Sequence, residues 1–273
     1  AVSLLVKLSK MDPGGSYSNR PINSLKRIFL PILPQTYATP HERLLVLERL
    51  ITKEPKLVWK FARDYYGTGM VVESHQFRWR QSDGERGRLE PEMPENSKEY
   101  LKGLQVKLKE LACLRENQIE SLKEFLSLPD DVQESLLLAV IAVDSSTLPK
   151  EESNQLLQHV RNVMSWINSY GEGIVLRHVP ALNRLLEKFT PQDLIEKVHW
   201  LFSDPWPTLP QGESLDGSAI SAAREAAAKE LLEQLSIEEI IDFAGKLSDA
   251  WSLGFSLGKI AGERENAYTV DAA

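Results

Sequence analysis

The sequence predicts an all-α protein in which antiparallel helical hairpins stack as an irregular solenoid of the HEAT or TPR type. Apolar residues recur at helical spacing along most of the 273-residue chain. Proline and glycine divide these segments into neighbouring pairs. Only residues 69–72 approach the alternation of a strand. A loose internal echo between residues 44–61 and 240–255 favours stacked pairs over a globin-like arrangement, without defining a regular repeat.

Residues 12–36, DPGGSYSNRPINSLKRIFLPILPQT, are the region around which the N-terminal part is organised. Glycine and proline punctuate this stretch, yet it carries more apolar side chains than an ordinary linker. We expect a short helix after Ser24, bounded by Pro31 and Pro34, that packs against the next hairpin. The stretch is therefore interpreted as a structural elbow between helical layers.

Helical patterns flank this elbow on both sides. Residues 2–10 precede it, and residues 41–54 and 57–66, separated by Pro55, follow it as a helical hairpin. Residues 98–273 continue as a helical array. Its helix starts are marked by Asp130, Asp131, Glu151, Glu152, Pro180, Asp193, Ser236, Glu238 and Glu239. The acidic pairs among them are explained better by the helix dipole than by acid/base catalysis.

The composition is that of a soluble protein with a sizeable core. Hydrophobic residues make up 42 % and charged residues 26 %, and the single cysteine excludes an internal disulfide. No apolar run reaches the ~20 residues of a membrane helix. We therefore expect a cytoplasmic protein without membrane contact. The chain opens in mid-helix, which suggests a fragment of a larger polypeptide.

Charge is distributed unevenly. Residues 1–88 contain 15 Lys and Arg against 8 Asp and Glu, whereas the remainder contains 17 against 31. The pattern suggests a basic N-terminal helical part over 1–66, a long irregular loop over 67–97 and an acidic helical array over 98–273. A basic surface is compatible with nucleic-acid binding. More commonly, such a charge asymmetry arises because the basic and acidic regions complement each other or a neighbouring domain.

The loop over 67–97 combines aromatic and arginine side chains. Its centre, HQFRWRQSDGERGR, places Trp79 among several arginines. The candidate partner-binding residues here are Arg78, Trp79, Arg80, Arg86 and Arg88. Aromatic rings beside guanidinium groups suit single-stranded nucleic acid. Anchoring of the loop on its own domain is the alternative, and the commoner one.

Four further tryptophans fall into two kinds. Trp59, Trp166 and Trp200 lie in apolar helical stripes and are predicted to be core residues. Trp206 lies between two prolines in the loop SDPWPTLPQG, so it is a further candidate for contact with a partner. Local packing of that loop is the alternative.

No catalytic, cofactor or metal motif is visible. The chain has no P-loop, and its glycines lack the strand-loop-helix setting of a dinucleotide site. The five histidines are dispersed, with neither an HExxH motif nor nearby cysteines. We therefore assign no catalytic, cofactor-binding or metal-binding residue from the sequence.

Five sequence segments, taken in order, resemble those of a known family. They are the 12–36 stretch, FRWR, VHWLFSDPWPTLP, AAREAAAKELLEQLS and WSLGFSLG. They are similar to a helical-repeat region of large bacterial multidomain proteins, and the resemblance extends to antiviral STAND-type signalling NTPases. It spans essentially the whole chain, but the nucleotide-binding and effector motifs of such proteins are missing, so no catalytic residue is transferred. The resemblance implies a sensor or scaffold arm of a defence protein.

Three functions follow as hypotheses. The first is a non-enzymatic helical scaffold that recognises another protein or neighbouring domains of its own polypeptide. The second is a nucleic-acid-binding module that uses the basic first third and the loop over 75–88. The third is an enzyme whose site is assembled only by the tertiary fold.

Overall fold

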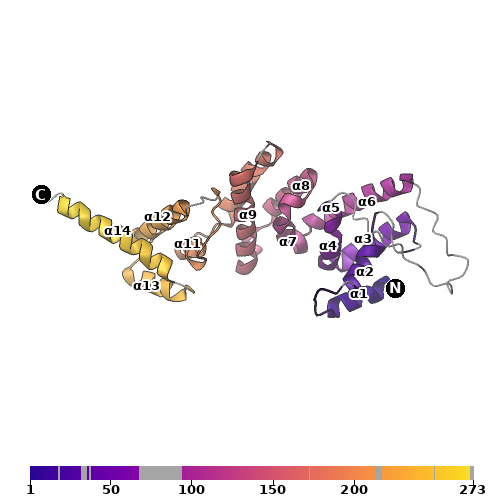
Figure 1. Cartoon of the computed structure of the whole chain (residues 1–273), viewed down its shortest axis with the longest axis horizontal. Coiled ribbons are helices and arrows are strands. Elements are labelled where there is room, and N and C mark those ends of the chain that lie inside the picture. Colours follow the sequence, from indigo (N-terminus) through magenta and orange to yellow (C-terminus); the bar gives the residue numbers. More distant parts are fainter. Residues whose placement is uncertain are drawn as a thin grey trace, which may run out of the picture. The chain divides into compact units, whose positions relative to one another are not determined.

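The computed structural model describes residues 1–17, 19–31, 36, 38–67, 94–171, 173–212, 217–248 and 250–270 (Figure 1). Every regular element in these ranges is an α-helix or a short 3-10 helix, which confirms the predicted all-α class. Stacking of the hairpins as a solenoid stays a prediction. Over the same ranges, no helix is both long and apolar enough to cross a lipid bilayer.

The chain divides into two compact units, Ala1–Val143 and Asp144–Ala273. The first unit contains α1 (Val2–Met11), α2 (Pro21–Ile28), α3 (Pro40–Lys53), α4 (Pro55–Ala62), α5 (Asp64–Gly67), α6 (Pro94–Cys113), α7 (Gln118–Lys123) and α8 (Asp130–Ala142). The second contains α9 (Lys150–Tyr170), α10 (Val179–Phe189), α11 (Leu194–Ser203), α12 (Ser218–Gln234), α13 (Ile237–Lys246) and α14 (Trp251–Val270). Packing therefore places α6 to α8 with the N-terminal helices, whereas the charge pattern groups them with the acidic remainder.

Helix α2 lies at the centre of the elbow, between α1 and α4. It begins at Pro21 and not after Ser24 as predicted, because a proline at the first helical position has a preset φ and no N–H to leave unpaired. The segment after it is anchored by Phe29, which is fully buried and stacks on Phe61 with ring centroids 5.7 Å apart. Leu33, another apolar residue of the 12–36 stretch, lies outside the described residues.

The carbonyl groups at the end of α2 are satisfied by side chains from three other helices. Tyr65 Oη donates to Lys26 O at 2.6 Å, and Tyr100 Oη donates to Phe29 O at 2.9 Å. The buried Arg43 donates through Nη1 to Leu30 O at 2.6 Å, and its guanidinium lies over the Tyr100 ring. Helix C-termini leave such carbonyls unpaired unless capped, so these contacts fix the direction of the chain at the elbow.

The second unit has a core that joins its four C-terminal helices. Its buried residues are Val198, Leu201, Phe202, Leu209, Ala227, Leu231, Ile240, Phe243 and Leu253. They come from α11 to α14 and from the loop that follows α11. Leu209 in particular ties this loop to the helices.

Predicted helix starts are confirmed by their caps. Asp193 accepts a hydrogen bond from Glu196 N–H, and Ser236 and Glu239 form a reciprocal capping box. The pairs Asp130–Asp131, Glu151–Glu152 and Glu238–Glu239 all lie in first turns. A second capping box, Thr39 with Glu42, starts α3.

Stability should depend on pH through the α13 cap. The backbone N–H of Ser236, and then its hydroxyl, donate to Glu239 and lower the pKa of that carboxyl. Because the pKa is lower in the folded chain, this contribution is present above the unfolded pKa and is lost as pH falls through the folded one. Glu239→Gln should therefore weaken hydrogen-exchange protection of α13 at neutral pH, with the difference from wild type shrinking in acid. Glu238→Gln, in the same turn, is the matched control.

Candidate functional site

The loop between α11 and α12 is held by an arginine from α12. Arg224 Nε donates to Leu201 O at 2.8 Å, and Nη2 donates to Asp204 O at 2.7 Å and to Pro205 O at 3.2 Å. One guanidinium thus satisfies the carbonyls at and after the end of α11. From the other side, Asn168 Nδ2 donates to Pro210 O at 2.6 Å. These contacts fix residues 204–210 of the loop, whose prolines further restrict its backbone.

This fixed loop presents Trp206 to solvent. Asp204 Oδ1 accepts a hydrogen bond from Trp206 N–H at 2.9 Å, an Asx turn that sets the local backbone. The Trp206 side chain is 73 % exposed. At Gly217, φ is +70°, and a Cβ there would lie 3.5 Å from Trp206 Cζ3. Glycine at this position supplies the left-handed backbone that starts α12 beside the indole.

A second exposed tryptophan lies at the start of α14. Trp251 is 68 % exposed and stacks on Phe255, one turn later, with ring centroids 5.3 Å apart and an interplanar angle of 19°. Phe255 is itself 58 % exposed. Stacking of this kind holds both rings in one orientation.

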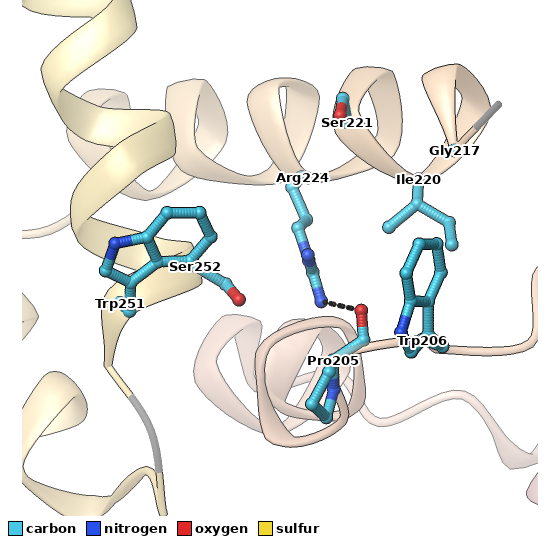
Figure 2. Close-up of a pocket in the computed structure, with 8 residues that line it drawn as sticks. All are labelled: Pro205, Trp206, Gly217, Ile220, Ser221, Arg224, Trp251 and Ser252. Atoms are coloured by element: carbon cyan, nitrogen blue, oxygen red, sulfur yellow. Dashed lines mark hydrogen bonds between the residues drawn. The ribbon is translucent and has the colours of Figure 1, made fainter.

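The two tryptophans flank a pocket of about 320 Å³ (Figure 2). It is lined by Pro205, Trp206, Gly217, Ile220, Ser221, Arg224, Trp251 and Ser252. Figure 2 shows Trp206 beside Ile220, and Trp251 on the other side of Arg224. Ser252 is buried, and its hydroxyl points toward Arg224.

The lining is suited to binding an apolar group whose orientation is set by a few polar side chains. Its walls are aromatic and aliphatic, and its polar groups are two hydroxyls and a guanidinium. None of the lining residues is a histidine, a cysteine, a lysine or a carboxylate. Such a site offers contact area and hydrogen-bond donors, without a group that exchanges protons near neutral pH.

The sequence-derived candidates have different outcomes. Trp206 forms one wall of the pocket. The other candidates, Arg78, Trp79, Arg80, Arg86 and Arg88, lie outside the described residues, and so does the strand-like segment over 69–72.

Of the tryptophans predicted as core, Trp59 is buried and Trp200 is half-buried. The prediction for Trp166 was wrong, because its side chain is 41 % exposed and pairs with Tyr170 on the surface of α9. The buried face of α9 is a different one and includes Val163, Met164 and Ile167.

Several pocket residues were not predicted from the sequence. Trp251 lines the pocket, and Phe255, on which it stacks, lies four residues later, the spacing at which two rings meet on a helix, so the sequence did contain this signal. Arg224 and Ser252 had no such signal, because their meeting with the loop is set by tertiary packing.

Two other arrangements bear on catalysis and on metal binding. Ser203 Oγ lies 2.8 Å from His199 Nδ1 but also donates to His199 O at 2.7 Å, the local bond of a serine to the preceding helical turn. Among the described residues, no carboxylate is hydrogen-bonded to this histidine in the manner of the third member of a catalytic triad. Within the described ranges, no three His, Cys, Asp or Glu side chains are placed to hold a metal ion.

Comparison of the chain with protein-family models, curated proteins and solved structures found no match. The functional interpretation therefore rests on the geometry of the pocket. By that geometry the site is a pocket with aromatic walls, formed by helices and by the loop that follows α11.

Proposed function

We propose that this chain is a non-enzymatic α-helical scaffold that recognises another protein through the pocket between Trp206 and Trp251. The observation that carries the proposal is the exposure of both indoles, 73 % and 68 %, on opposite walls of one pocket. Tryptophan exposed to this extent on two fixed elements is unusual, because large aromatic side chains are mostly buried on average.

Covering these rings would yield a large gain in free energy. An aromatic side chain buries ~150–250 Å² when it is covered. At ~25 cal/mol per Å², each indole would contribute several kcal/mol before the costs of association. Tryptophan and arginine are also the residues most often found at binding hot spots. The Asx turn holds the backbone at Trp206, and stacking on Phe255 restrains the Trp251 ring, so less conformational entropy is lost when a partner covers them.

The wider context of this proposal comes from the resemblance to bacterial helical-repeat proteins. A solenoid of helical hairpins presents an extended surface on which such a pocket is accessible to a partner. In that setting the chain would act as a sensor or scaffold arm of a larger bacterial defence protein, which binds a protein partner or a neighbouring domain. Pairs of sequence neighbours, such as α3 with α4 and α9 with α10, pack together and support this arrangement.

Nucleic-acid binding is supported less well by the described part of the chain. Several basic residues of the first unit are paired with carboxylates inside that unit. The pairs are Lys10–Glu54, Arg20–Asp12, Lys26–Asp64, Arg63–Glu124 and Lys107–Glu48. A cation that is already paired has less to gain from a phosphate.

The test is selection of binders from a random peptide library on the immobilised full chain. Trp206→Ala and Trp251→Ala should each weaken the selected peptides by at least about tenfold, which corresponds to about 1.4 kcal/mol. Binding is measured by fluorescence anisotropy of the labelled peptide.

Trp166→Ala is the matched control, because Trp166 is also an exposed tryptophan of the second unit but does not line the pocket. It should leave the affinity unchanged. Peptides that bind all three variants equally, or a library that yields no binder, would contradict the proposal.

A further inference from the structure

Helix α13 presents an apolar stripe to solvent. Ile237 and Ile241 are 60 % and 63 % exposed, and they share one face of the helix because they lie four residues apart. Gly245 continues the stripe one turn later. No atom from another part of the described chain lies within 4 Å of a Cβ built at Gly245. The stripe therefore ends in open space, where the backbone of another helix can approach closely.

The other side of α13 is anchored in the core of the second unit. Ile240 and Phe243 are buried there, and the Phe243 ring packs edge-on against Phe202 with ring centroids 6.2 Å apart. The capping box of Ser236 and Glu239 fixes the start of the helix. An amphipathic surface helix ordinarily has one apolar face, toward the core, and a polar face toward water. The exposed isoleucines thus form a second apolar stripe on a fixed element.

Two carboxylates border this stripe. Glu238 and Asp242 are exposed, follow the two isoleucines in the sequence and are themselves four residues apart. Within the described ranges neither makes an ion pair. The helix dipole favours Glu238 in the first turn, but Asp242 lies beyond that turn, and like charges at this spacing repel each other. Residues 144–273 contain 11 Lys and Arg against 20 Asp and Glu, so a positively charged partner is favoured.

We propose that Ile237, Glu238, Ile241 and Asp242, the α13 face, bind a basic amphipathic helix of a partner protein. Apolar side chains of that helix cover the isoleucines, and its lysines or arginines pair with the carboxylates. The charged border selects against acidic helices. A second copy docked through the same face would bring the carboxylates of both copies together, so the charge favours a different partner. No residue of α13 lines the aromatic pocket, and this surface therefore goes beyond the proposed function.

The experiment uses fluorescence anisotropy of a labelled helical peptide made of leucine, alanine and lysine, titrated with the full chain. Its leucines are four residues apart, with a lysine beside each. The wild type should bind this peptide saturably and more weakly as salt is added, because exposed ion pairs are screened. The same peptide with glutamate in place of each lysine should bind at least about tenfold more weakly.

The apolar contribution is tested by the double variant Ile237→Ala and Ile241→Ala. It keeps good helix formers in α13 but removes most of the apolar area, so the lysine peptide should bind at least about tenfold more weakly. Leu138→Ala is the matched control, because Leu138 of α8 is 62 % exposed and lies in the first unit. It should leave the affinity unchanged.

The charge contribution is tested by the double variant Glu238→Gln and Asp242→Asn. Affinity for the lysine peptide should fall by about tenfold, and its dependence on salt should become weaker. The control is Glu134→Gln with Glu187→Gln, which changes the net charge equally at two exposed residues of α8 and α10. This control should bind as the wild type does.

Three results would overturn the proposal. They are a wild type that does not bind the lysine peptide, a double alanine variant that binds it as the wild type does, and an equal loss of affinity in the two charge variants. Trp206→Ala should leave the affinity unchanged. A loss of binding in Trp206→Ala would place the peptide in the aromatic pocket, which would overturn the α13 face without contradicting the proposed function.

Discussion

Phe29→Ala is expected to lower the free energy of unfolding of the first unit by about 3–5 kcal/mol. The Phe29 ring is fully buried and stacks on Phe61 of α4. Its removal leaves a cavity beneath the segment whose carbonyls are held by Tyr100 and Arg43. Because these hydrogen bonds depend on the position of the chain after α2, they should weaken together with the packing.

Hydrogen-exchange mass spectrometry is the measurement, since it reads peptides of the two units separately. Peptides of α2, α4 and α6 should lose protection in Phe29→Ala, and those of the second unit should not. The matched control is Tyr17→Ala, because Tyr17 is an aromatic residue of the same stretch that is 76 % exposed. Unchanged protection in α4 would mean that Phe29 does not anchor the elbow.

Periodicity and capping chemistry are local, and they predicted much of the fold. The α13 start followed from Ser236 and Glu239 alone, and the loop after α11 followed from its prolines. Local signals were weaker where one helix has two partly apolar faces. On α9 the stripe that includes Trp166 resembled a buried face, but the helix buries the side that carries Arg161 instead.

The burial of two arginines could not be predicted from the sequence, for a physical reason. Arg43 and Arg161 are charged residues in helical patterns, where the default position is the surface. Each is buried because an aromatic ring from a distant segment covers its guanidinium, Tyr100 in one case and Trp200 in the other. The spacing of residues along the sequence does not indicate such a contact between distant segments.

The aromatic pocket was predicted only in part for the same reason. Trp206 was found because a tryptophan between two prolines is conspicuous within one short segment. The wall formed by Trp251 belongs to another helix, and the link between them is the core of α11 to α14. A pocket is a property of that packing rather than of either segment.

Arg224→Met is expected to destabilise the end of α11 and the loop after it by roughly 1.5–3 kcal/mol, the range of hydrogen bonds from a charged donor. Three carbonyls, those of Leu201, Asp204 and Pro205, lose their donor in this variant. The apolar part of the side chain is kept, so the loss of packing is small. Hydrogen exchange in residues 201–212 should rise, whereas Lys229→Met, an exposed change on the same helix, should leave it unchanged.

The same variant separates positioning of Trp206 from its direct contact with a partner. Arg224→Met leaves both indoles in the sequence but releases the loop that orients one of them. Affinity for the selected peptides should therefore fall by about tenfold, because the partner must now pay for ordering the loop. If affinity is retained while hydrogen exchange rises, the Asx turn at Asp204 and the burial of Leu209 are sufficient to orient Trp206. If neither changes, the loop is held by its prolines, and Arg224 contributes to the pocket only as part of its lining.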